Sequence, residues 1–177
     1  LIEAIALAIS RSQDKQAALI VLNSNSFTTV VEYYYKTDNI QQAREYLDKH
    51  IRLCTRVKAI SANTDDQFDY IDASYSIISG LASNNKDYLS SIKYTLLHKN
   101  YIFEKEAYSD QYFQKSTFLI YDYIESNQYI EALNEAILSF RDKINIGIDL
   151  DEALQVPSNT VLSIKTRAAY SNKLSDI

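Results

Sequence analysis

Histidine and cysteine, which often carry catalysis or bind metals, are scarce in this chain. The sequence contains two histidines, His50 and His98, and one cysteine, Cys54. Cys54 follows His50 by four residues, so on a helix both side chains would lie on one face, as a metal-binding pair requires. Two further ligands are not evident, and a free cysteine usually behaves as a small buried apolar residue. The sequence therefore predicts no metal site and no cofactor.

Arg44 and His50 form a second arrangement of chemical interest, because five residues separate them. An arginine can stabilise phosphate charge while a histidine transfers protons during attack by a 2′-hydroxyl group. The spacing is similar to the loose Arg-to-His motif of the all-helical HEPN ribonucleases, although Glu45 stands where that family usually has Asn, Asp or His. Such a short gap is common by chance. We predict no catalytic residue and keep a HEPN-like ribonuclease using Arg44 and His50 as an alternative.

Aspartates and tyrosines are the remaining candidates, and they suit binding rather than catalysis. Four aspartates lie close together with no basic residue between them, and the dipole of a helix beginning there explains only the first two. The chain also has 15 tyrosines, a residue type that suits interfaces because its ring can be buried while its hydroxyl stays in water. The residues predicted to bind a protein partner are Asp65, Asp66, Asp69, Asp72, Tyr33 and Tyr34.

The elements that position these residues must be helices. The sequence has 2 glycines and 1 proline. Sandwiches and barrels need glycine or proline at their tight turns, and phosphate-binding loops need glycine so that the backbone can approach the ligand. Hydrophobic residues make up 46% of the chain, which is enough for a core. We predict one all-α domain over residues 1–177, with about seven to nine helices.

Apolar residues at steps of three and four indicate where the helices lie. Helices are expected over 2–22, 27–36 and 40–60, after a capping box at 64–67, around 89–96, after Ser109, and after Asn127 as an N-cap. Gly147 is expected to end a helix in the left-handed conformation, and Pro157 to separate a short helix over 149–154 from a last one over 158–169. The residues expected to face inward late in the chain include Leu89, Ile92, Leu96, Ile130, Leu133, Ile137, Phe140 and Ile144.

A weak internal sequence repeat suggests how the helices are arranged. The segments beginning at Ile40, Lys86 and Tyr129 each lie one or two residues after an asparagine and open the second helix of an expected hairpin, at spacings of 46 and 43 residues. These periods are typical of helical repeats, although the tetratricopeptide pattern itself is absent. We expect stacked antiparallel helical hairpins, as either a bundle or a solenoid of the tetratricopeptide type.

The charge and cysteine counts limit the partners and the compartment. The net charge is −5, from 18 basic and 23 acidic residues, which argues against non-specific binding to nucleic acid or to an anionic membrane. One cysteine cannot form an intrachain disulfide, so the expected compartment is the reducing cytoplasm. The sequence has no methionine, even at position 1, and we expect it to lack N-terminal residues of a longer product.

Three segments carry a resemblance to a known family. They are an aromatic helix, polar turn and leucine helix over 68–89, and the stretches 123–133 and 156–164. Their order is similar to that in the immunity protein 49 family, the all-helical antidotes encoded beside bacterial toxins, although the tryptophans often seen there are absent. The resemblance implies a protein that binds and neutralises a cognate toxin without catalysis. The acidic charge balance favours a basic toxin, and a monomer and a homodimer both stay open. A helical-repeat adaptor of unrelated biology is the alternative.

Overall fold

The computed structural model describes residues 26–61 and 69–171, together with the single residues 4 and 7. These residues form seven α-helices and no β-strand, which confirms the all-α prediction. The helices are α3 (Ser26–Lys36), α4 (Ile40–Ser61), α5 (Tyr70–Asn84), α6 (Tyr88–Glu106), α7 (Asp110–Glu125), α8 (Tyr129–Asn145) and α9 (Leu150–Ser171). The helix expected over 2–22 and the capping box at 64–67 lie outside the described ranges.

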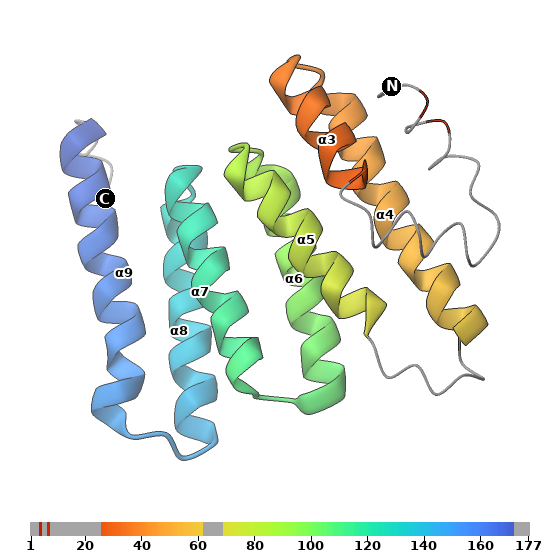
Figure 1. Ribbon diagram of the computed structural model, residues 1–177. Helices are drawn as coiled ribbons and strands as arrows, with labels where there is room; N and C mark the ends of the chain where they lie inside the picture. Colours follow the sequence, from red (N-terminus) through yellow and green to blue (C-terminus); the bar gives the residue numbers. More distant parts are fainter. Residues whose placement is uncertain (1–3, 5–6, 8–25, 62–68, 172–177) are drawn as a thin grey trace. The chain divides into compact units, whose positions relative to one another are not determined.

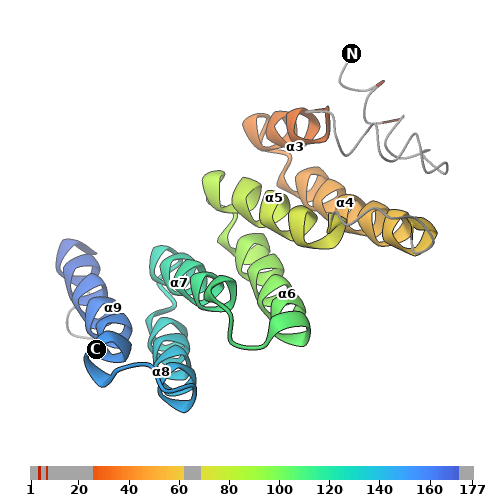
Figure 2. The ribbon, with the colours of Figure 1, turned by 60° about the horizontal axis from the view of Figure 1, so that its bottom comes forward.

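The helices divide into two compact units, with the boundary inside α6 between Ser91 and Ile92. In the first unit α3 and α4 form an antiparallel hairpin, and α5 packs against both (Figure 1). In the second unit α7 and α8 form an antiparallel hairpin, and α9 packs against both of its helices (Figure 2). Helical hairpins are therefore the building blocks of the fold, as the sequence predicts.

Four turns between helices share one backbone geometry. The residues Asp38, Lys86, Asn127 and Gly147 have positive φ angles of 56°, 61°, 61° and 84°. After each, the next backbone N–H donates to the carbonyl five residues earlier, as Asn39 does to Tyr34 at 2.8 Å. This is the Schellman ending of a helix. The expectation for Gly147 is confirmed, whereas Asn127 ends α7 instead of capping α8, because asparagine tolerates the left-handed conformation.

Residues at matching positions around three of these turns have similar burial. The first three left-handed residues follow one another after 48 and then 41 residues. Residues at equal distances from them are buried alike, which makes the hairpins structural repeats. The equivalent buried sets are Val30, Ile78 and Leu119; Ala43, Ser91 and Ala132; Leu47, Thr95 and Ala136; and His50, His98 and Ser139.

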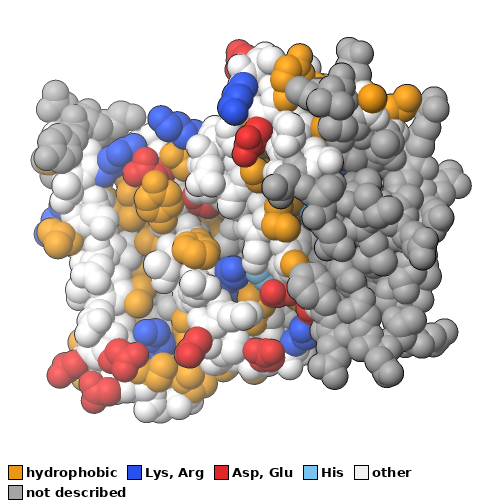
Figure 3. Space-filling view, viewed as in Figure 1, with side chains coloured by type: hydrophobic (Ala, Val, Ile, Leu, Met, Phe, Trp, Pro, Cys, Tyr) orange, Lys and Arg blue, Asp and Glu red, His pale blue; other side chains and the backbone are white. Residues whose placement is uncertain are grey.

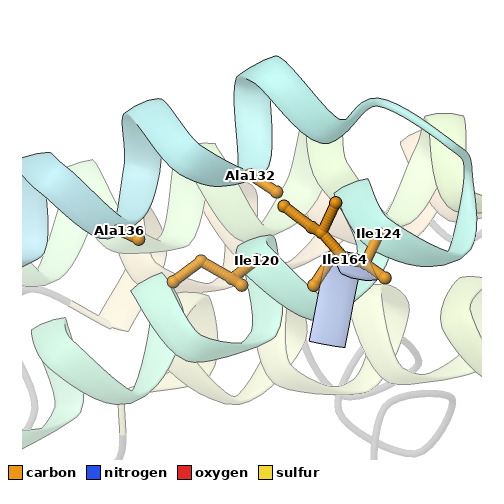
Figure 4. Close-up of a cluster of buried hydrophobic side chains, with 5 residues drawn as sticks. All are labelled: Ile120, Ile124, Ala132, Ala136 and Ile164. Carbon is orange, nitrogen blue, oxygen red and sulfur yellow. The ribbon is translucent and has the colours of Figure 1, made fainter. Parts of the chain in front are cut away.

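The orientation expected for α8 is wrong. Ile130, Ile137 and Ile144 were expected inside but are 71%, 57% and 38% exposed. The inward face instead carries Ala132 and Ala136, whose small side chains allow close approach to Ile120, Ile124 and Ile164 of α7 and α9 (Figure 4). The same error occurs on α6, where Ile92 is buried but Leu89 and Leu96 are exposed.

Paired polar groups explain why α8 turns this face inward. The buried Glu135 forms an ion pair with the buried Lys99 of α6. Asp142, also buried, accepts a hydrogen bond of 2.9 Å from the Tyr112 hydroxyl of α7. Lys99 also lies 4.5 Å from the centre of the Tyr112 ring. Buried charges with such partners are tolerated, and without them they would be costly.

Pro157 does not break the last helix as expected, because α9 runs through it from Leu150 to Ser171. A proline inside a helix costs about 3 kcal/mol through its missing N–H and its ring. Buried residues on both sides of it, Ala153 before and Thr160 and Ile164 after, belong to one continuous inward face. Packing of this face against α7 and α8 offsets the local cost.

Candidate protein-binding groove

The predicted partner-binding tyrosines lie on α3 and differ in exposure. Tyr33 is exposed, and its ring meets that of Tyr34 edge-on at 5.6 Å. Tyr34 is half-buried and stacks on Tyr46 of α4 at 5.4 Å. The hydroxyl of the next residue, Tyr35, donates to Asp87 at 3.0 Å. Of the two predicted residues, Tyr33 has the more accessible side chain.

The predicted acidic residues fall at the start of α5. Asp69 is the N-cap of this helix and accepts hydrogen bonds of 3.1 Å from the N–H groups of Ile71 and Asp72. Asp72 lies in the first turn, where the helix dipole favours a negative charge. Both aspartates thus have a local structural role that the sequence analysis did not assign. Asp65 and Asp66 lie outside the described residues.

Arg44 is engaged within the protein. Its Nε donates to Asp87 Oδ2 at 2.9 Å and its Nη2 to Oδ1 at 2.7 Å. Burial opposes the ionised form of Asp87, but hydrogen bonds from Arg44, Ser90 and Tyr35 outweigh it and lower the pKa of this carboxyl group. The guanidinium group is thereby neutralised by a bidentate carboxylate, which accepts from two of its five N–H groups.

His50 and Cys54 lie inside the first unit. Both side chains are buried, with Cys54 Sγ at 3.9 Å from His50 Nδ1. The same Nδ1 forms a hydrogen bond of 2.6 Å with Ser74 Oγ, and the His50 ring packs on Phe27 with 4.1 Å between ring centres. Burial lowers the pKa of His50 to about 4 and raises that of Cys54 to about 11. At neutral pH the pair is uncharged and packed, as the sequence analysis expects for Cys54.

A groove lies between α7 and α9 in the second unit. It has a volume of about 800 Å³. Ile120, Ile124 and the half-buried Val156 form its apolar base. Tyr121 on α7 and Leu162 on α9 line it with more exposed side chains. Figure 3 shows hydrophobic side chains gathered over these helices, with acidic side chains near the start of α9. The groove thus combines an apolar base with accessible aromatic and aliphatic groups.

Two ion pairs lie at the ends of this groove. Arg167 Nη2 of α9 is 2.9 Å from Glu125 Oε2 at the end of α7. Lys143 Nζ of α8 is 3.7 Å from Glu152 Oε1 at the start of α9. All four residues line the groove, and their charges sum to zero. The groove therefore carries no excess of one charge that would select a phosphate or a carboxylate ligand.

Neutral polar side chains of α9 form the remaining wall. Gln155, Asn159 and Ser163 follow one another at steps of four, so they share one side of the helix. Among the described residues, the side-chain amides of Gln155 and Asn159 have no hydrogen-bond partner, and both residues are exposed. Each amide offers donors and an acceptor. This wall can hydrogen-bond a polypeptide backbone, which presents both kinds of group.

The sequence alone does not predict this groove. Tyr121 is one of 15 tyrosines, and Gln155 stands next to the helix break expected at Pro157. Had α9 been treated as continuous through Pro157, the spacing of Gln155, Asn159 and Ser163 would have indicated one polar face. The groove itself also needs α7, whose residues come about 40 positions earlier, and no local pattern indicates that pairing.

Other kinds of site are not found in the described part of the chain. Its His, Cys, Asp and Glu residues include no group of three or more placed to hold a metal ion. None of its helices has the length and apolar character needed to cross a membrane. Comparisons of the chain with protein-family models, with curated proteins and with solved structures gave no match. The groove between α7 and α9 is therefore the candidate functional site.

Proposed function

We propose that this chain acts by binding another protein, and that the groove between α7 and α9 receives an extended segment of it. The observation that carries the proposal is the combination of an apolar base at Ile120 and Ile124 with the amide groups of Gln155 and Asn159. An apolar base rewards the burial of a side chain, and the amides can pair with the backbone on either side of it.

The charges of the groove favour a peptide over a small anion. Both cationic side chains, Lys143 and Arg167, already contact carboxylates. Binding an anion would require one of these pairs to separate, which adds a cost that a neutral peptide segment avoids. The preferred segment is therefore uncharged at its centre and carries an apolar anchor.

The class of partner is a narrower proposal. The resemblance to the immunity protein 49 family implies a cognate toxin, and neutralisation would then follow from covering the toxin's active site or substrate path. A scaffold of unrelated biology would use the same groove. The toxin proposal is tested by co-expressing the chain in bacterial cells with the product of the neighbouring reading frame. Rescue of growth supports it, and growth arrest despite binding contradicts it.

The ribonuclease alternative has less support. Arg44 is held by Asp87, and His50 is buried with its Nδ1 on Ser74. A general acid or base must reach the substrate, and a phosphate-binding arginine must be open to it. We expect the purified chain not to cleave RNA. Cleavage that disappears in His50→Ala would reinstate this alternative.

The peptide-binding groove is tested by selecting ligands from a phage library of short random peptides on the intact chain. Selected peptides should bind Tyr121→Ala and Asn159→Ala at least about tenfold more weakly, measured by fluorescence anisotropy. Lys165→Ala is the matched control, because Lys165 is exposed on the same helix but does not line the groove. Peptides that bind all four proteins equally would show that the groove is not the site.

A further inference from the structure

The exposed face of α8 carries an apolar stripe with a regular period. Ile130, Ile137 and Ile144 lie seven residues apart, and all three are exposed. Leu138 is exposed beside them. A seven-residue repeat keeps the three isoleucines on one side of the helix, which is the pattern of helices that pair lengthwise. Large apolar side chains gathered on one exposed helix face usually mark an interaction surface.

The neighbouring helix repeats the stripe, and the first hairpin lacks it. Relative to the hairpin turns, Leu96, Leu97 and Phe103 of α6 correspond to Ile137, Leu138 and Ile144 of α8, and they are also exposed. The residues of α4 at the same three positions are Asp48, Lys49 and Thr55. The fold tolerates polar residues at these positions. The apolar residues of α6 and α8 are therefore not required by the hairpin itself.

The stripe on α8 is symmetric about its centre. Ile137 lies midway between Ile130 and Ile144, so two antiparallel copies of α8 would place Ile137 against Ile137 and each Ile130 against the other copy's Ile144. The exposed residues Glu131 and Arg141 flank the same edge of the stripe, near opposite ends. A twofold axis between antiparallel helices places this edge of one copy beside the same edge of the other copy. Each Glu131 would then lie near the Arg141 of the other copy, whose Nη2 also contacts Asp142 Oδ1 of its own chain at 3.3 Å. Together the two copies would form two Glu131–Arg141 ion pairs.

We propose that the α8 stripe is the contact surface of a homodimer in which two copies of α8 pack antiparallel about a twofold axis at Ile137. Symmetric oligomers are built from such self-complementary patches. The apolar stripe supplies the burial, and the charge pattern selects the antiparallel register over the parallel one, which would place Glu131 near Glu131. The groove between α7 and α9 is a separate surface, so this inference does not depend on the peptide proposal.

Sedimentation equilibrium of the intact chain over a wide range of concentrations tests the dimer. The mass should rise with concentration toward twice that of the monomer. Ile137→Asp should weaken association at least about tenfold, because each dimer would bury two unpaired carboxylates. Val161→Asp is the control, since Val161 is an exposed aliphatic residue of α9, at 39%, that belongs neither to the stripe nor to the groove lining. A single monomeric mass at the highest attainable concentration would overturn the proposal. The stripe would then be a binding surface for a different protein.

Charge exchange tests the register. Glu131→Arg alone and Arg141→Glu alone should each weaken association, because each creates two like-charge contacts. The double variant should associate within about threefold of the original chain, since the pairs are restored in reverse. Circular dichroism checks that each variant stays helical. Loss of association in the double variant equal to the sum of the single losses would reject this pairing.

Cysteine cross-linking tests the symmetry directly. Ile137→Cys should form an intermolecular disulfide on its own, because both copies meet at this residue. Ile130→Cys alone and Ile144→Cys alone should not, whereas an equimolar mixture of the two should cross-link. The native Cys54 is buried and supplies no competing thiol. Cross-linking by Ile130→Cys alone would indicate a parallel dimer and overturn the antiparallel arrangement.

Discussion

Arg44 and Asp87 join the second helix of the first hairpin to the start of α6 across 43 residues of sequence. The Asp87 carboxylate also accepts from the Ser90 N–H at 3.3 Å, so it caps α6 as well. The buried Asp87 side chain thus caps α6, forms the ion pair with Arg44 and accepts the hydrogen bond from the Tyr35 hydroxyl. The guanidinium side of the pair is partly exposed, at 36%, which reduces its share of the stabilisation.

Asp87→Ala should lower the free energy of unfolding by about 2 to 3 kcal/mol, because it removes the cap of α6 and the ion pair with Arg44. Urea unfolding followed by circular dichroism measures this. The exposed Glu32–Lys36 pair, at 3.8 Å, is the matched control, and Lys36→Ala should change stability by less than about 0.5 kcal/mol. Equal effects of the two substitutions would contradict the role given to Asp87.

Asp87 should also make stability depend on pH in the acid range. Its pKa is lower in the folded protein than in the unfolded chain, so its contribution is present above the ordinary aspartate pKa and is lost as the pH falls through the folded value. The difference in stability between the native chain and Asp87→Asn should therefore shrink on acidification. A difference that grows instead would reverse the sign of this linkage.

His50 should give a separate pH dependence at a higher range. Burial lowers its pKa from 6.5 to about 4, so between these values the unfolded chain binds a proton that the folded chain does not. The free energy of unfolding should fall by about 3 kcal/mol as the pH is lowered across this window. His50→Gln should remove this slope, as measured by urea titrations at several pH values, while His98 remains in both proteins. An unchanged slope in the variant would assign it to another group.

Two buried serines should respond in opposite ways to removal of their hydroxyl groups. Ser74 Oγ is bonded to His50, whereas Ser116 Oγ has no hydrogen-bond partner within the described part of the chain. Ser74→Ala should destabilise the protein by about 1 to 2 kcal/mol, and Ser116→Ala should be neutral or stabilise it by about 1 kcal/mol. Melting temperatures of the two variants provide the comparison. A large loss in Ser116→Ala would show that its hydroxyl group is satisfied.

The acidic surface predicted from the sequence is best tested at Asp72. Asp69→Lys would also remove the N-cap of α5, at a cost of about 1 kcal/mol, so a binding defect there would mix two effects. Asp72→Lys keeps the cap. It should weaken the binding of a basic partner such as polylysine without loss of helix content. Isothermal titration gives the affinity. Unchanged affinity would remove this surface from the candidates.

The sequence indicates the type and number of the helices more reliably than the way they face. The scarcity of glycine and proline, the cap at Ser109 and the left-handed Gly147 are local properties, and each is found in the structure. On α8, by contrast, Ile137 and Ala136 belong to stripes of the same period. Periodicity therefore indicates a helix without deciding which stripe is inside. The choice depends on Lys99, which lies 36 residues from its partner Glu135.

Dependence on long-range packing also explains why the sequence does not predict the groove. Tyr121 and Leu162 become neighbours in one groove only after α7, α8 and α9 have packed. Asp69 and Asp72 are close in sequence, so their clustering is visible without a structure, but their capping role depends on α5 beginning at Tyr70. Long-range pairing of helices, more than local propensity, decides which side chains are left for a partner.

The turn of each hairpin has the same backbone hydrogen bond. The N–H that follows Asp38, Lys86 or Asn127 donates to the carbonyl five residues before it. Because this closure uses only residues of the hairpin itself, a whole hairpin can be duplicated or deleted without changing the turn of the next one. Descendants of such a gene would differ in length by steps of about 40 to 50 residues. Evolution could thus alter the number of hairpins while leaving each existing loop intact.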